Sequence, residues 1–167
     1  MIELLILFVF PAGMAMAAAL DFFTMTISNK LALVLLAGFV VLAASVGLPL
    51  EEVVRHAGAG LAMLAIGFAM FAVGWVGGGD AKLFAVTALW LGWGHLLEYA
   101  VLLSLCGGAL TLALLFVRRL PLPHVLCEAD WAVRLHHPRG DIPYGIALAA
   151  AGLMIYPHTF WMARLTG

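Results

Sequence analysis

The sequence Gly77-Gly78-Gly79-Asp80-Ala81-Lys82 lies between two long apolar runs and decides how the chain is interpreted. Three consecutive glycines weaken a helix, because each costs about 1 kcal/mol relative to alanine in a helix interior. They also let backbone segments approach closely. A carboxylate follows at once, at the edge of an apolar segment where an ionisable group is costly to hold. Asp21 ends the first apolar run, so we interpret Asp21 and Asp80 as a pair.

Composition indicates an integral membrane protein. The 167 residues are 65% hydrophobic and 10% charged, with a mean hydropathy of +1.13, whereas soluble domains carry about 25% charged residues. A membrane-spanning helix needs about 20 apolar residues. We therefore predict an all-α, polytopic membrane helix bundle with about six transmembrane helices, forming a single domain over residues 1–167. The net charge of −1 gives no indication of nucleic-acid binding.

The apolar runs define the six predicted spans. They cover residues 4–20, 31–48, 57–76, 80–93, 96–117 and 142–155. The third run is rich in glycine and alanine, and small residues let membrane helices pack closely, so we place it inside the bundle. Between the second and third runs, Glu51, Glu52, Arg55 and His56 are interpreted as a short polar loop.

The basic residues orient the predicted bundle. If the spans alternate in direction, one side holds Lys30, Lys82, Arg118, Arg119, Arg134 and Arg139, and the other holds Arg55 and Arg164. The positive-inside rule assigns the first side to the cytoplasm. Asp21 and Asp80 then both lie at cytoplasmic helix ends, and this supports the pair independently, because the charge count does not use the acids.

Two carboxyl groups at one depth are suited to peptide hydrolysis. Such a pair shares one proton and titrates as a unit. The ionised member accepts a proton from water while the neutral member donates to the scissile carbonyl oxygen. Other chemistries lack motifs: no serine has a local nucleophile motif, and His124, His136, His137 and Cys127 match no strong zinc spacing. We expect no metal.

Each acid also has a purely structural interpretation. Asp80 is suited to capping the following helix, where the helix dipole favours negative charge. Asp21 is suited to being the polar end of a span. Two other functions stay open: a small membrane transporter that uses buried acids, and a non-enzymatic subunit of a pilus or secretion assembly.

Several motifs resemble those of type IV prepilin peptidases, a family of intramembrane aspartic proteases. Gly77-Gly78-Gly79-Asp80-Ala81-Lys82-Leu83 resembles the GxGD motif of this family. Asp21, with the later Ile27-Ser28-Asn29-Lys30, resembles the first catalytic aspartate and the segment that follows it. Ile142-Pro143-Tyr144-Gly145-Ile146-Ala147 resembles the opening of the last helix. The resemblance therefore runs from end to end.

The short chain is most similar to the minimal peptidases of tight-adherence (Flp) pilus systems, without the cysteine-bearing cytoplasmic domain of larger relatives. This resemblance implies an aspartic endopeptidase of the bacterial inner membrane that cuts a short basic leader from prepilins at the cytoplasmic face. Pseudopilins are further candidate substrates, no cofactor is implied, and the oligomeric state is left open. Ser28 stands where the family usually has proline, and Phe-Phe-Thr-Met-Thr follows Asp21 where basic residues are common.

The sequence thus predicts three groups of site residues. Asp21 and Asp80 are the predicted catalytic residues, and Gly77, Gly78 and Gly79 the predicted backbone support. Candidates for contacting the substrate or supporting the acids are Asn29, Lys30, Lys82, Pro143 and Tyr144.

Overall fold

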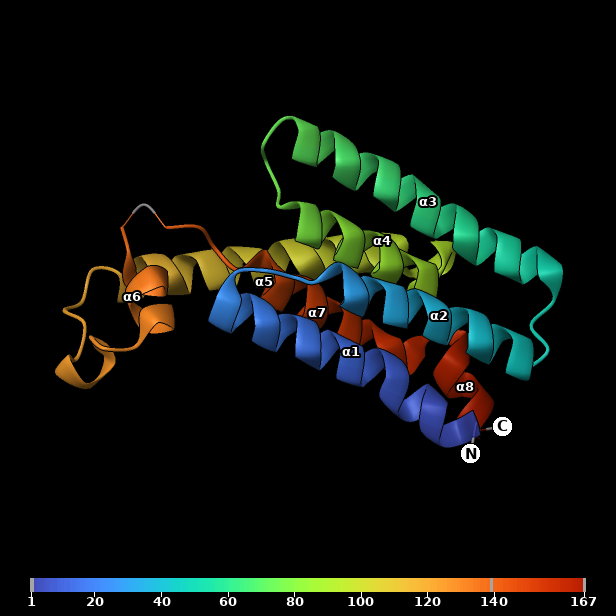
Figure 1. Cartoon of the computed structure of the whole chain (residues 1–167). Helices are drawn as coiled ribbons and strands as arrows, with labels where there is room; N and C mark the ends of the chain where they lie inside the picture. Colours follow the sequence, from blue (N-terminus) through green and yellow to red (C-terminus); the bar gives the residue numbers. More distant parts are fainter. Residues whose placement is uncertain (1, 139, 167) are drawn as a thin grey trace.

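The long apolar runs form helices in the computed structural model, which describes residues 2–138 and 140–166 (Figure 1). Within these residues there are eight α-helices and no strand. They are α1 Ile2–Thr24, α2 Asn29–Ser45, α3 Leu50–Ala72, α4 Gly78–Leu91, α5 Leu96–Val117, α6 Asp130–His136, α7 Tyr144–Ile155 and α8 Phe160–Thr166. The predicted all-α membrane bundle is confirmed. Arg139, which entered the charge count, lies outside the described residues.

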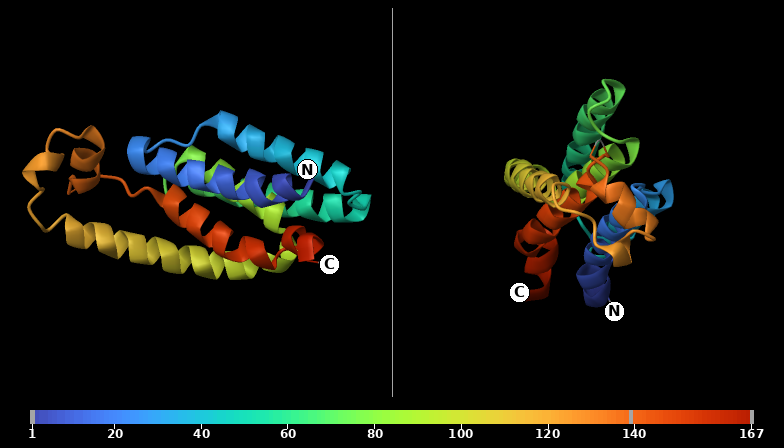
Figure 2. Two further views of the ribbon diagram at one scale, coloured as in Figure 1. Left: turned by 90° about the horizontal axis from the view of Figure 1, so that it is seen from below. Right: turned by 90° about the vertical axis from the view of Figure 1, so that its left-hand side faces the viewer.

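Successive long helices run in opposite directions. One end of the bundle holds the last turn of α1, the α3–α4 connection and α6, while the α2–α3 connection and α8 lie at the other (Figures 1 and 2). Contacts agree with this arrangement. Arg134 donates to the Phe23 carbonyl at the first end, and Arg164 donates to the Val46 carbonyl at 3.2 Å at the second. The predicted alternation of loops is therefore present among the described residues.

The helices differ in length. By length and composition, three described segments can cross a membrane: Ile2–Thr24, Leu50–Ala72 and Trp93–Val117. The 14 residues of α4 and the 12 residues of α7 extend about 21 and about 18 Å at 1.5 Å per residue, less than the roughly 30 Å of a hydrocarbon core. After α7 the chain continues through a short 3₁₀ turn, Tyr156–His158, into α8.

The predicted polar loop before the third span is wrong. Glu51, Glu52, Arg55 and His56 lie in the first two turns of α3, which begins at Leu50. The Arg55 guanidinium contacts Glu51 at 2.9 Å and Glu52 at 3.4 Å, and such pairs, one turn apart, stabilise a helix. Acidic residues in a first turn also complement the helix dipole, so these charges favour the helix.

The prediction that the glycine-rich third helix lies inside the bundle is also wrong. Most of α3 is exposed, and its buried residues, among them Ala59, Gly60 and Gly67, form one narrow face against α4. The centre is occupied by α4, which packs against α2, α3 and α7. Small residues on α3 therefore allow a close approach to α4 along one face without burying the rest of the helix.

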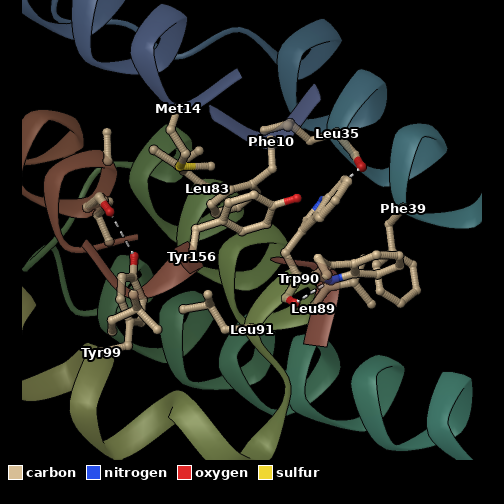
Figure 3. Close-up of a cluster of buried hydrophobic side chains, with 14 of the residues drawn as sticks. Phe10, Met14, Leu35, Phe39, Leu83, Leu89, Trp90, Leu91, Tyr99 and Tyr156 are labelled. Carbon is tan, nitrogen blue, oxygen red and sulfur yellow. Dashed lines mark hydrogen bonds between the residues drawn. The ribbon is translucent and has the colours of Figure 1, made fainter. Parts of the chain in front are cut away.

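Aromatic side chains cross-link the helices within the core (Figure 3). The indole N–H of Trp90 donates to the Leu35 carbonyl at 3.1 Å, and that of Trp161 donates to the Trp90 carbonyl at 3.0 Å. The hydroxyl of Tyr156 donates to the Ile6 carbonyl at 2.7 Å. Hydrocarbon cannot satisfy buried polar groups, so each donor is bonded internally and fixes the register of two elements.

The close packing of α3 on α4 predicts opposite effects for two identical substitutions. A Cβ at Gly60 would lie 3.1 Å from Leu89 Cβ and 3.3 Å from the Ala85 carbonyl oxygen. At Gly58 the nearest atom would be Trp93 Nε1, at 3.5 Å. Both changes to alanine gain about 1 kcal/mol of helix propensity. We expect Gly58→Ala to raise the melting temperature in detergent and Gly60→Ala to lower it, because α4 must move away; equal shifts would contradict this packing.

Candidate active site

Asp21 lies in the last turn of α1, and its side chain is only 5% exposed. The backbone N–H of Gly145 donates to Asp21 Oδ2 at 2.6 Å. Gly145 is the second residue of α7, so this N–H is among the first donors of a helix, which have no partner within it. The start of α7 therefore holds the carboxyl of Asp21.

Asp80 is the third residue of α4, whose N-cap is Gly77. The backbone of Gly77 lies close enough to the Asp80 carboxyl to interact favourably with it. A third-position side chain that reaches back toward the N-cap is the arrangement of a capping box. Asp80 is therefore placed to stabilise the start of α4, as its structural interpretation expects.

The two acids line one cavity of about 220 Å³. Its lining residues are Asp21, Met25, Thr26, Ile27, Gly77, Gly78, Gly79 and Asp80. The carboxyls of Asp21 and Asp80 are close enough for their charges to interact directly. The structure thus brings together the two predicted acids and the three predicted glycines, at the end of the bundle that contains α6.

The three glycines leave space for close packing, and they do not form a flexible loop. Gly78 and Gly79 belong to the first turn of α4. A Cβ at Gly79 would lie 3.0 Å from Ile27 Cβ and 3.2 Å from the Ile27 carbonyl oxygen. A Cβ at Gly77 would lie 3.1 Å from Asp80 Oδ2. The absence of side chains therefore allows the α1–α2 connection to press against the start of α4, which brings the two acids together.

Two residues that sequence reasoning did not assign to the site shape it as well. A Cβ at Gly145 would lie 2.7 Å from Asp21 Oδ2 and 2.8 Å from Ile27 Cδ1, so only glycine fits. The sequence feature that could have identified Gly145 as a site residue was its place in the Pro-Tyr-Gly motif. Met25 follows α1 directly and lines the cavity. Its φ of 53° is a conformation that normally favours glycine or asparagine, so no sequence pattern predicts a methionine there.

The remaining predicted residues do not line this cavity. The Lys82 ammonium donates to the Asn29 amide oxygen at 2.7 Å and joins α4 to the start of α2. Pro143 is the N-cap of α7, and Tyr144 lies beside α5, with its hydroxyl 3.3 Å from Thr111 Oγ1. Lys30 is exposed. Whether these residues take part in the reaction stays a prediction.

The segment around α6 covers the end of α1. The Trp131 ring lies 5.2 Å from that of Phe22, and Leu135 is buried. Arg118 donates to the Leu135 carbonyl at 2.7 Å and to the Asp141 carbonyl at 2.9 Å. Across residues 2–138 and 140–166, no group of three His, Cys, Asp or Glu side chains is arranged to hold a metal ion.

The chain has helices long and apolar enough to cross a bilayer, and two carboxyls line one cavity near one end of the bundle. These features place it among helical membrane proteins that hold acids within a helix bundle. The sequence profile of the type IV leader peptidase family matches residues 8–112, and the chain belongs to this family. Asp21, Asp80 and the three glycines all lie within the match. The predicted resemblance at 142–147 lies outside it and stays a prediction.

Comparisons with curated proteins and with solved structures give no significant match. Family membership makes the chain a membrane protease of the kind that removes leader peptides from type IV prepilins. The predicted family is therefore confirmed.

The contact between Gly145 and Asp21 predicts the effect of a single methyl group. Gly145→Ala places that methyl against Asp21 Oδ2 and displaces the carboxyl, and a misplacement of about 1 Å can cost about 10²-fold in rate. We expect a loss of prepilin cleavage of that order with normal membrane insertion, measured by a gel-shift assay. Gly94→Ala is the control, because a Cβ there meets nothing within 4 Å. Full activity of Gly145→Ala would contradict the positioning role.

Proposed function

We propose that the protein is an aspartic endopeptidase that cuts leader peptides from prepilins, with Asp21 and Asp80 as the catalytic pair. The observation that carries the proposal is the shared cavity, into which α1 and α4 each bring one carboxyl. The Asp21 carboxyl accepts a hydrogen bond from the Gly145 N–H, and the Asp80 carboxyl lies beside the Gly77 backbone. These contacts support the proposal, because acid–base catalysis requires positioned groups.

The proposed reaction uses one shared proton. The ionised carboxyl takes a proton from a water molecule, and the water oxygen bonds to the scissile carbonyl carbon. The neutral carboxyl gives its proton to the carbonyl oxygen, so a neutral tetrahedral intermediate forms. When the C–N bond breaks, the carboxyl that took the water proton gives it to the leaving nitrogen, and a hydroxyl of the intermediate returns its proton to the other, ionised carboxylate. A new carboxyl group and a free amine form, and the pair again holds one proton. The pair acts as a unit, so neither residue is assigned the role of acid or of base.

The proposal includes location and substrate. The basic residues at the end of the bundle that holds the two acids favour the cytoplasmic face of the bacterial inner membrane. We also propose Flp-type prepilins as substrates, and that residues 1–167 act as one domain. Asn29, Lys30, Lys82, Pro143 and Tyr144 are proposed to support the acids or contact the substrate.

The catalytic pair is tested by removing one ionisable oxygen at a time. Asp21→Asn and Asp80→Asn keep the size of the side chain and an oxygen that accepts hydrogen bonds. We expect each to lower prepilin cleavage by about 10²–10⁴-fold, the usual contribution of acid–base catalysis, in a gel-shift assay with reconstituted protein. Glu98→Gln is the control, because that carboxylate is 54% exposed and lies 3.5 Å from His95 Nδ1, at the other end of the bundle.

The outcomes separate the alternatives. Cleavage by the native protein and by Glu98→Gln, but by neither aspartate variant, supports the proposal. Cleavage by all four proteins refutes the catalytic pair. A protein that cleaves no prepilin but conducts solute into liposomes is a transporter, and one that does neither while assembling with pilus components is a structural subunit.

The orientation is tested with a native cysteine. Cys127 is exposed and lies between α5 and α6, at the end of the bundle that contains the two acids. We expect a membrane-impermeant maleimide to label Cys127 only after the inner membrane of spheroplasts is permeabilised. Ser45→Cys, at the end of α2, should be labelled without permeabilisation when Cys127 is replaced by serine. The reverse pattern would place the acids outside the cytoplasm.

A further inference from the structure

A second, larger cavity also reaches Asp80. It has a volume of about 600 Å³. We call it the α4–α5 groove, and residues that define it are Asp80, Phe84, Ser104, Gly108, Thr111 and Tyr144. Asp80 lines both this groove and the two-acid cavity, so the two spaces meet at a proposed catalytic carboxyl.

The groove lies between two pairs of helices. Helix α3 packs on α4, and α5 packs on α7, and residues from all four helices line the space between. In the right-hand view of Figure 2, α5 (yellow) and α3 (green) extend from the centre in different directions. Along α5 the lining runs from Leu103 to Leu112, which corresponds to about 14 Å of helix at 1.5 Å per residue.

The face that α5 presents to this space has small residues at its centre. Ser104, Gly107, Gly108 and Thr111 line the groove between Leu103 and Leu112. Gly107 is covered by Tyr144, because a Cβ there would lie 3.4 Å from the tyrosine ring. At Gly108 a Cβ would meet nothing within 4 Å. The backbone of α5 is thus open to an incoming helix at Gly108, and small residues are what membrane helices use for close contact.

We propose that the α4–α5 groove holds one apolar helix of the prepilin substrate, namely the segment that follows the bond to be cut. This inference rests on the proposed function of Asp21 and Asp80. A polypeptide at hydrocarbon depth must satisfy its own backbone hydrogen bonds and therefore be helical. The almost wholly apolar lining excludes a basic leader, because lysine and arginine are costly there. The leader then lies on the polar side of the acids, and the mature segment lies in the groove.

A steric test uses adjacent positions on α5. Gly108→Phe fills the groove, whereas Ala109→Phe adds a ring at an exposed position that does not line it. We expect Gly108→Phe to lower kcat/KM for a full-length prepilin by about tenfold or more, mainly through KM, as loss of ground-state binding does. Ala109→Phe should stay within about twofold. Equal activity of the two variants would overturn the groove proposal. That is the result expected if only lipid occupies the groove.

A cross-linking test avoids the large substitution. Gly108→Cys and Ala109→Cys are each made in a background that lacks the native cysteines (Cys106→Ser and Cys127→Ser). The background also carries Asp21→Asn, so that bound prepilin is not cut. Each variant is oxidised together with prepilins that carry single cysteines after the cleavage site. We expect disulfides to Gly108→Cys at prepilin positions spaced three or four residues apart, the helical repeat, and few to Ala109→Cys. Equal cross-linking, or none while the native enzyme cuts the same prepilin, would overturn the groove. Absence of cleavage by the native enzyme would instead refute the proposed function.

Discussion

The hydrogen bond from the Gly145 N–H to Asp21 Oδ2 joins the start of α7 to the end of α1 across 124 positions of sequence. The arrangement of the site depends on it, because the carboxyl of Asp21 is buried and a buried polar group without a partner is costly. The contact requires a glycine at 145, since a Cβ would lie 2.7 Å from the carboxyl oxygen. It also requires α1 and α7 to pack side by side, as they do.

Asp80 lies at the start of another helix that lines the same cavity. Its carboxyl interacts favourably with the backbone of Gly77, the N-cap of α4. Unpaired N–H groups are available only in the first turn of a helix, and this explains why two carboxyls can meet at one end of a bundle of antiparallel helices. The opposite end is fixed by the hydrogen bonds of Trp90, Trp161 and Tyr156. Hydrogen bonds of buried aromatic side chains therefore hold the helices together at the end remote from the acids.

Sequence patterns located the six longer helices and the acids but misjudged α3, and they did not predict the short helices α6 and α8. Its charged first turn suggested a loop, because composition alone does not show that Arg55 pairs with Glu51 and Glu52 along a helix. Its glycines suggested a central position, because small residues indicate close packing without showing how many faces are packed. The contribution of Met25 had no signal, since methionine with a positive φ is unexpected in any pattern.

The sequence by itself determined that this is a helical membrane protein, that Asp21 and Asp80 lie at like ends of two antiparallel spans, and that its motifs resemble those of prepilin peptidases. These properties follow from local hydropathy, charge and spacing, which need no knowledge of distant contacts. Only the tertiary structure decided that Gly145 holds Asp21, that α4 and not α3 is central, and that a groove beside α5 opens at Asp80. Those properties depend on which helix faces meet, and that is set by packing among residues far apart in the chain.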